Sequence, residues 1–204
     1  MILVGEKADE IGADVISLNS FEAGKMLAQH LLESGYKKIA YLSTPFSNIT
    51  VARQKRLDGI RKAMEESGCA DSLIVLADTE ENESMNIAFE TQCGQRLTRQ
   101  LLQQYPDCQA IIAVNDMTAY GCMHALQEQG KRIPEDIALC GFDNLFLDEV
   151  ISPTLTSVEQ MAFQGCKIAL NMLLDKLKNP NAREQQLYLE YKPQLHIRSS
   201  TAKK

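Results

Sequence analysis

Apolar segments that fit buried strands alternate with segments of helical periodicity through most of the chain. The strand-like runs are rich in β-branched residues and cover 15–18, 38–43, 73–77, 110–114 and 137–142. A short continuous apolar run closed by polar residues is typical of a parallel strand covered on both faces. Repetition of strand and helix predicts an α/β fold with right-handed crossovers and a doubly wound parallel sheet.

Helices are predicted between and after these strands. They cover 21–34, 51–67, about 84–104 and 116–129. Gly35, Gly68 and Gly130 stand where three of them should end, because glycine readily adopts the left-handed conformation that closes a helix.

Two parts of the chain lie outside this repeat. Residues 1–4 form a predicted strand with no helix before it, and 155–158 form another that leads into a long helix. Closing strands are expected at 187–191 and 195–198. The last residues, 199–204, are expected to fray.

The long helix, predicted over 161–178, is apolar on more than one side. Ile168 and Met172 lie on one face, and Leu170 and Leu174 lie on another. Such a helix is either a central core helix or one that packs against a second lobe or a second subunit.

Composition indicates a globular chain that does not contact nucleic acid by itself. The chain has 204 residues, 45% of them hydrophobic, with a net charge of −6 and a pI near 5.2. A DNA-binding face needs basic residues that displace counterions from phosphates, so DNA binding through these residues alone is not expected. No signal peptide and no apolar stretch of roughly 20 residues is seen, so a cytoplasmic location is expected.

Catalytic or metal-binding residues are hard to find. The sequence has no G-x-S-x-G elbow, phosphate-binding loop or dinucleotide fingerprint, and His30, His124 and His196 are far apart. The cysteines are scattered, and Cys140 and Cys166 lie within or beside apolar patterns, which favours small buried hydrophobes over a disulfide or zinc site. No catalytic residue, metal ion or cofactor is therefore expected.

Polar side chains that end two predicted strands favour a binding site. Asn115 and Asp116 end the fourth strand and Asp143 ends the fifth, so all three should meet at the carboxyl edge of the sheet. Arg56 adds a guanidinium, and this set suits a polyhydroxyl molecule such as a sugar. Simpler alternatives stay open, in which Asn115 or Asp116 caps a helix. Independently of this, Asp143 could close a turn and Arg56 could be a surface cation.

Several segments have a shared order that is characteristic of one protein family. They are 30–42 (HLLESGYKKIAYL), 56–60 (RLDGI), 113–121 (AVNDMTAYG), 133–144 (IPEDIALCGFDN) and 152–160 (SPTLTSVEQ). Together they resemble the effector-binding region of the LacI/GalR family of bacterial transcriptional repressors. The resemblance implies a periplasmic-binding-protein-like fold of type I, in which two lobes hold an effector, often a sugar or nucleobase, between them.

The resemblance also implies individual effector contacts. Arg56 precedes the Leu-Asp-Gly motif, Asn115 opens the Asn-Asp motif, and Asp143 ends the Gly-Phe-Asp motif. Gln160 stands where the family often lines the cleft.

One position departs from the family pattern. Many sugar-binding members place an aromatic ring just after the third strand, where this chain has Asp78 and Thr79. Thr79 is therefore the expected contact there, and stacking on a sugar would need Phe46 or Tyr120.

The family's helix-turn-helix headpiece and most of its N-terminal lobe have no counterpart in the sequence, so the chain is expected to be N-terminally truncated. The expected division begins with a remnant of the N-terminal lobe and a crossover (1–18) and the C-terminal effector-binding lobe (19–153). It continues with a crossover and helix of the N-terminal lobe (154–180) and the closing strands and tail of the C-terminal lobe (181–204).

The leading hypothesis is the effector-sensing domain of a LacI-type repressor. A small effector, a sugar or related polar metabolite, closes the lobes and alters DNA binding in a homodimer. Operator DNA is contacted only through the headpiece, and no membrane partner is expected. The alternatives are a periplasmic-type sugar-binding receptor of a transport system and an α/β enzyme with an unrecognised site.

Overall fold

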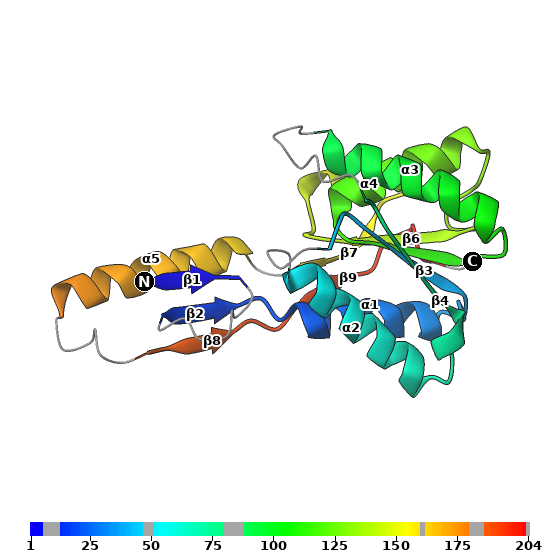
Figure 1. Cartoon of the computed structure of the whole chain (residues 1–204). Coiled ribbons are helices and arrows are strands. Elements are labelled where there is room, and N and C mark those ends of the chain that lie inside the picture. Colours follow the sequence, from blue (N-terminus) through cyan, green and yellow to red (C-terminus); the bar gives the residue numbers. More distant parts are fainter. Residues whose placement is uncertain (6–12, 47–50, 80–87, 160–161, 180–185, 203–204) are drawn as a thin grey trace.

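A computed structural model describes residues 1–5, 13–46, 51–79, 88–159, 162–179 and 186–202, and these form two lobes of unequal size (Figure 1). The large lobe contains a six-stranded sheet and the small lobe a three-stranded sheet. The chain passes between the lobes after β2, after β7 and after β8.

The sheet of the large lobe has the order β4-β3-β5-β6-β7-β9. All neighbouring strands are parallel except β9, which is antiparallel to β7. The strands are β3 (Ile39–Ser43), β4 (Leu73–Ala77), β5 (Ala110–Ala113), β6 (Ala138–Phe142), β7 (Thr156–Glu159) and β9 (Gln194–His196). The predicted doubly wound α/β fold is therefore confirmed.

Helices cover both faces of this sheet. One pair lies on one face and the other pair on the opposite face (Figure 1). The pairs are α1 (Ser20–Glu33) with α2 (Val51–Glu66), and α3 (Phe89–Gln104) with α4 (Asp116–Glu128). Two apolar clusters fill the spaces between sheet and helices.

Helices α1 and α2 pack with almost no space between their backbones. A Cβ atom added at Gly24 would lie 2.1 Å from the carbonyl oxygen of Arg56, so only glycine fits there. This contact fixes the part of α2 that carries Arg56.

The small lobe contains a parallel sheet of order β1-β2-β8, with α5 packed beside β1. Its elements are β1 (Ile2–Val4), β2 (Asp14–Ser17), β8 (Tyr188–Glu190) and α5 (Ala162–Lys178). One strand prediction was wrong in placement, because β8 does not close the large sheet. Strand β2 lies outside the large lobe, as the expected boundary at residue 18 had it, although the repeat of strand and helix had counted it with the large sheet. An apolar strand pattern records burial, but not which sheet provides the neighbouring strand.

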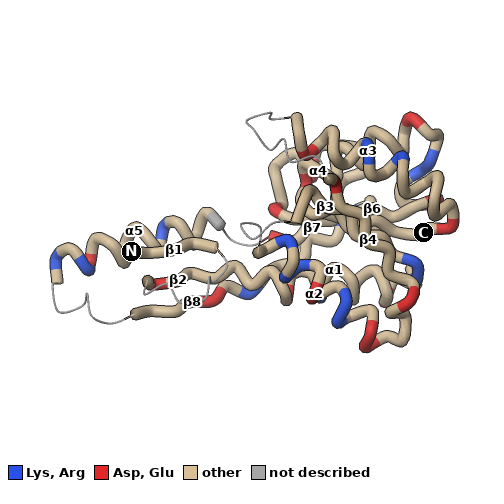
Figure 2. The backbone as a smooth tube through the Cα atoms, viewed as in Figure 1, with Lys and Arg blue, Asp and Glu red and all other residues tan. Residues whose placement is uncertain are grey.

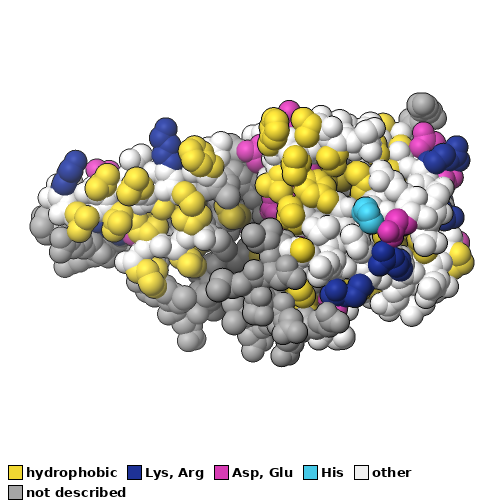
Figure 3. Space-filling model, turned by 90° about the horizontal axis from the view of Figure 1, so that it is seen from above, with side chains coloured by type: hydrophobic (Ala, Val, Ile, Leu, Met, Phe, Trp, Pro, Cys, Tyr) yellow, Lys and Arg dark blue, Asp and Glu magenta, His cyan; other side chains and the backbone are white. Residues whose placement is uncertain are grey.

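Helix α5 lies on one face of the small sheet and is not a central core helix. Phe163 is 81% exposed, Leu170 57% and Leu177 60%. Hydrophobic side chains accordingly gather over this lobe in the space-filling view (Figure 3). The core-helix alternative was therefore wrong, while packing against a further partner stays a prediction.

The chain end at 199–202 is docked and not frayed. Ser200 and Thr201 are fully buried. Ser200 Oγ donates to Leu139 O at 2.6 Å, and Thr156 N donates to Ser200 Oγ at 2.8 Å. These polar contacts, which apolar periodicity cannot reveal, attach the tail to β6 and β7.

Basic and acidic residues are interspersed along the helices of the large lobe (Figure 2). Among the described residues, none of the helices is both long enough and apolar enough to cross a lipid bilayer.

Candidate functional site

Arg56 reaches from α2 to the carboxyl ends of β5 and β6. The residue is 9% exposed. Its Nη1 donates to the carbonyl oxygen of Val114, just after β5, and its guanidinium carbon lies 4.5 Å from the centroid of the Phe142 ring. A stacked and hydrogen-bonded guanidinium is held in one orientation, so the surface-cation alternative for Arg56 was wrong.

Asp143 directly follows β6 and has a φ of 114°, which is unusual for a residue with a side chain. Its amide donates to Val158 O at 2.9 Å, which keeps the backbone in this conformation. The side chain reaches solvent. Even so, the surrounding protein weakens its hydration and raises the pKa of Asp143 to about 6, while the charge of Arg56 opposes the shift.

Asn115 caps helix α4. Its Oδ1 accepts from Thr118 N at 2.9 Å, and its Nδ2 donates to Glu90 Oε1 at 2.7 Å. The capping alternative is thus the role that the structure shows, and contact between Asn115 and a ligand stays a prediction.

Glu90 was missed in the sequence. It lies in the first turn of α3, bonds Asn115, and raises the pKa of Asp143 through its charge. An acidic residue in a first helical turn is common, since it complements the helix dipole, so sequence offers little to distinguish it. Its position at the helix that follows β4 was the available signal.

Asp116 is close to Asp143, as predicted, but it is sealed inside the protein. The residue is fully buried and accepts from Ser157 Oγ at 2.8 Å and from Leu145 N at 3.1 Å. Burial and, to a smaller extent, the nearby Asp148 together raise the pKa of Asp116 to about 9. Asp116 is therefore an internal group and does not face a ligand.

The remaining predicted contacts divide between the surface and residues that the structure leaves undescribed. Thr79 is exposed after β4, and its amide donates to Asp78 Oδ1 at 2.8 Å. Asp78 in turn forms an ion pair with Arg96. Gln160 lies outside the described residues.

The two aromatic residues considered for stacking differ in availability. Phe46 is 36% exposed and lies beside Tyr41, with ring centroids 6.5 Å apart. The hydroxyl of Tyr120 donates to Asp148 Oδ1 at 2.8 Å. Phe46 is thus the better placed of the two to meet a ligand.

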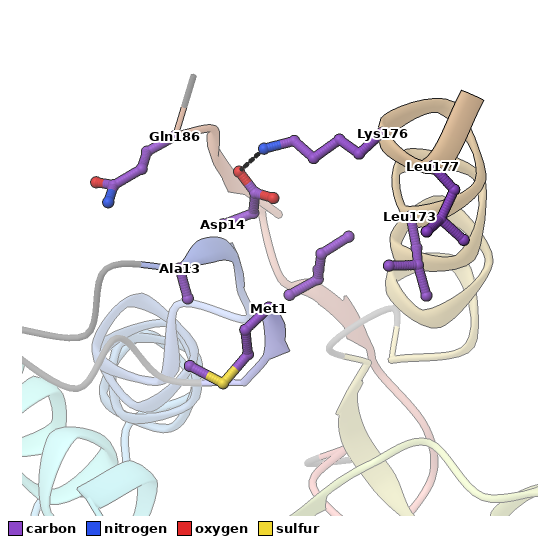
Figure 4. Close-up of a pocket in the computed structure, with 8 residues that line it drawn as sticks. Met1, Ala13, Asp14, Leu173, Lys176, Leu177 and Gln186 are labelled. Carbon is purple, nitrogen blue, oxygen red and sulfur yellow. Dashed lines mark hydrogen bonds and ion pairs between the residues drawn. The ribbon is translucent and has the colours of Figure 1, made fainter. Parts of the chain in front are cut away.

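A cavity of about 250 Å³ lies in the small lobe, away from the predicted contacts. It is lined by residues of β1, β2 and α5 and by residues just before β1, β2 and β8 (Figure 4). Lys176 Nζ and Asp14 Oδ1 form an ion pair of 2.8 Å there, with Leu173 and Leu177 alongside. Asp14 also accepts from Leu187 N at 2.8 Å, so the ion pair ties α5 to the small sheet.

Metal and redox chemistry find little support in the described part of the chain. No group of three or more His, Cys, Asp or Glu residues is arranged there to hold a metal ion. Cys140 is buried, as predicted, whereas Cys166 is exposed on α5, contrary to prediction.

Comparison with known proteins connects this geometry to a family. A family model described as the periplasmic binding protein-like domain matches residues 28–201. The HTH-type transcriptional repressor PurR of Escherichia coli O1:K1 is 34% identical over 191 residues, covering 93% of this chain and 52% of the relative. PurR of Mannheimia succiniciproducens is 30% identical and is covered to 53%. The chain thus spans about half the length of the curated relatives it matches.

Solved structures give the same result. A LacI family transcriptional regulator from Enterococcus faecium, with bound ribose, has a TM-score of 0.84 and 29% identity, covering 98% of this chain and 70% of that one. A LacI family regulator from Enterococcus faecalis V583, also with bound ribose, has a TM-score of 0.83 and 27% identity, covering 98% and 68%.

Proposed function

This chain belongs to the family of periplasmic binding protein-like domains, in the form found in LacI-family transcriptional regulators, and from that premise we propose that it senses a small effector for a repressor. The effector is a sugar or related polar metabolite held between two lobes. Its binding alters DNA binding by a helix-turn-helix headpiece in a cytoplasmic homodimer.

The family match over residues 28–201 carries this proposal. The placement of Arg56 and Asp143 supports it, because a fixed guanidinium and a solvent-reaching carboxylate lie at the carboxyl edge of one parallel sheet. In open α/β sheets this edge is where ligands bind. Ribose in two LacI-family neighbours supports a sugar as the effector class.

A change of DNA affinity requires that the effector binds one arrangement of the lobes more tightly than another. Coupling of this kind typically amounts to about 1–3 kcal/mol. The three chain crossings between the lobes provide the places where such a rearrangement can occur.

The test is isothermal calorimetry of this chain with D-ribose and a panel of neutral pentoses and hexoses. For a sugar that binds, Asp143→Ala should weaken binding by roughly 1–3 kcal/mol, because a charged hydrogen-bond acceptor is lost. Arg56→Ala should weaken it by a similar amount, with folding checked by circular dichroism because Arg56 is buried.

Asp107→Ala is the matched control. Asp107 is an exposed carboxylate that pairs with Lys38 and precedes β5, at the opposite edge of the sheet. It should leave affinity unchanged. Equal affinity in wild type and both site variants would contradict the site, and no binding across the panel would contradict a neutral sugar as effector.

A further inference from the structure

Two fully buried carboxyl groups meet beneath the proposed site. Asp116 begins α4 and Asp148 lies in the 3-10 turn Phe146–Glu149, and both are 0% exposed. Asp148 lies close to Asp116, because Tyr120, one turn after Asp116 on α4, donates its hydroxyl to Asp148 Oδ1 at 2.8 Å, and burial together with the charge of Asp148 raises the pKa of Asp116. Among the described residues, Asp148 Oδ2 is buried without a hydrogen-bond partner and lies 4.0 Å from Nη1 of Arg198.

The charges of this pair can be balanced by one proton. Two ionised carboxylates side by side without water are strongly disfavoured, and one of them takes up a proton. One bound proton leaves a single negative charge, which Arg198 faces. A proton between the carboxyls also supplies the missing hydrogen bond of Asp148 Oδ2.

The same pair holds the backbone that follows Asp143. Leu145 N donates to Asp116 Oδ2 at 3.1 Å. Ser157 Oγ donates to both oxygens of Asp116, at 2.8 and 3.1 Å, and lies 3.0 Å from the amide of Asn144, which donates to it. The two residues after Asp143 are therefore tied, directly or through Ser157, to Asp116.

Asp148 anchors the other end of this turn. It accepts from the hydroxyl of Tyr120 at 2.8 Å, and its own amide donates to Leu145 O at 2.9 Å. Arg198 bonds Asn144 Oδ1 at 2.7 Å and Leu155 O at 2.7 Å.

We propose that Asp116 and Asp148 share one proton and act together as positioning residues that aim Asp143 at the ligand. The step from backbone to ligand rests on the proposed function, since it takes Asp143 as a ligand contact. The shared proton itself does not, because it is argued from the burial of both carboxyl groups and from the unpartnered Oδ2 of Asp148.

The groups facing the pair come from every element packed against it. They are Tyr120 on α4, Cys140 on β6, Asp143 after β6, Glu149 in the 3-10 turn and Arg198 after β9. Burial and the bond to Asp148 raise the pKa of Tyr120, so its phenol keeps its proton and donates. Glu149 is exposed and bonds Arg198 at 3.2 Å.

The shared proton predicts a pH dependence with a definite sign. Folding raises the pKa of Asp116 to about 9 from an ordinary value of 3.8, so the folded state binds a proton that the unfolded chain releases. Stability from this group is fully present below the unfolded pKa and is lost as pH rises towards the folded pKa.

The experiment compares wild type with Asp116→Asn and Asp116→Ala by amide hydrogen exchange and by urea unfolding from pH 5 to 9. Asparagine is neutral and keeps an acceptor for Leu145 N, so the exchange of Leu145 should stay within about twofold of wild type. Asp116→Ala removes the acceptor and should speed that exchange by about tenfold or more.

Urea unfolding measures the pH dependence of the folding equilibrium, which would not change if Asp116 had a structural role without a bound proton. The folding equilibrium of wild type should fall relative to Asp116→Asn by up to about tenfold per pH unit as pH rises. Asp136→Asn is the control, because Asp136 is an exposed carboxyl whose pKa is lowered by Arg132. Its difference from wild type should be constant over this range.

Two results would overturn the proposal. One is equal Leu145 exchange in wild type and Asp116→Ala; the other is a wild-type Asp116 carboxyl that ionises below pH 5 by carbon NMR. If Asp116→Ala does not fold, the pH profiles of wild type and Asp116→Asn still decide. If the pair behaves as proposed but no sugar binds, the effector function fails and the shared proton stands.

Discussion

At the scale of single residues, the site depends on side chains whose roles are set by their neighbours. Asn115 and Asp116 are adjacent, yet one caps a helix near the surface and the other is an internal carboxyl. The difference arises because Asn115 precedes the helix while Asp116 points between α4 and the strands β6 and β7. Polar residues at a strand end are thus not equivalent ligand candidates.

Gly141 makes room for the carboxyl of Asp116. A Cβ atom at Gly141 would lie 2.3 Å from Asp116 Oδ1, so Gly141→Ala must displace the carboxyl. We expect Gly141→Ala to lower the free energy of unfolding by roughly 1–3 kcal/mol, as overpacking of a core does, measured by urea denaturation.

Gly165→Ala is the matched control for that change. The nearest atom to a Cβ at Gly165 is 3.4 Å away, and the residue lies inside helix α5. This variant should be neutral or stabilising by up to about 1 kcal/mol, because alanine favours helices. Equal destabilisation of both variants would show that the carboxyl of Asp116 does not depend on Gly141.

At the scale of elements, local patterns predicted helices and strands better than they predicted partners. Helix α1 begins at its Asn19 cap, whose Oδ1 accepts from Glu22 N at 3.0 Å, close to the predicted start. The sheet membership of β8 could not be predicted, because pairing depends on residues distant in sequence. For β2 the strand pattern was equally silent, and only the family resemblance placed residues 1–18 outside the large lobe. The buried tail was missed for the same reason, since its partners are backbone groups of β6 and β7.

The docked tail should contribute measurably to stability. Ser200→Ala leaves Thr156 N and Leu139 O without a buried hydrogen-bond partner that they now have. We expect a loss of roughly 1–3 kcal/mol in the free energy of unfolding. Ser199→Ala is the control, since Ser199 is exposed and water can replace its hydroxyl's 2.7 Å hydrogen bond to Thr154 Oγ1, so stability should change by less than about 0.5 kcal/mol. A Ser200→Ala variant as stable as wild type would argue against a structural role for the tail.

At the scale of the whole molecule, the family could be inferred from several motifs that follow one another in a characteristic order, while the detailed contacts within the site could not. Arg56 and Asp143 were identified by motif, and the structure brings both to one sheet edge. Glu90 was not predicted as a site residue because acidic residues are common in the first turn of a helix. Asp148 was not predicted because its role depends on its burial near Asp116, which the spacing of residues in the sequence does not indicate.

The exposed apolar side of α5 predicts self-association. Leu170 and Leu177 are 57% and 60% exposed, and apolar surface of this extent tends to find a partner. In sedimentation over a concentration series, we expect the average mass of wild type to rise with concentration. Leu170→Glu combined with Leu177→Glu should abolish the rise, while Gln164→Glu, on an exposed position of the same helix, should not. A wild type that stays monomeric throughout would contradict the prediction.

The crossings after β2 and β8 are bonded to one another, because Tyr191 N donates to Ser17 O at 2.9 Å and Asn19 Nδ2 donates to Glu190 Oε1 at 2.8 Å. Two of the three linkers therefore form a single double-stranded strap. Such a strap flexes readily across its flat face but resists sliding of one strand past the other. We expect the two lobes to rotate relative to one another by bending of this strap, without translation of one lobe along the direction of the linkers.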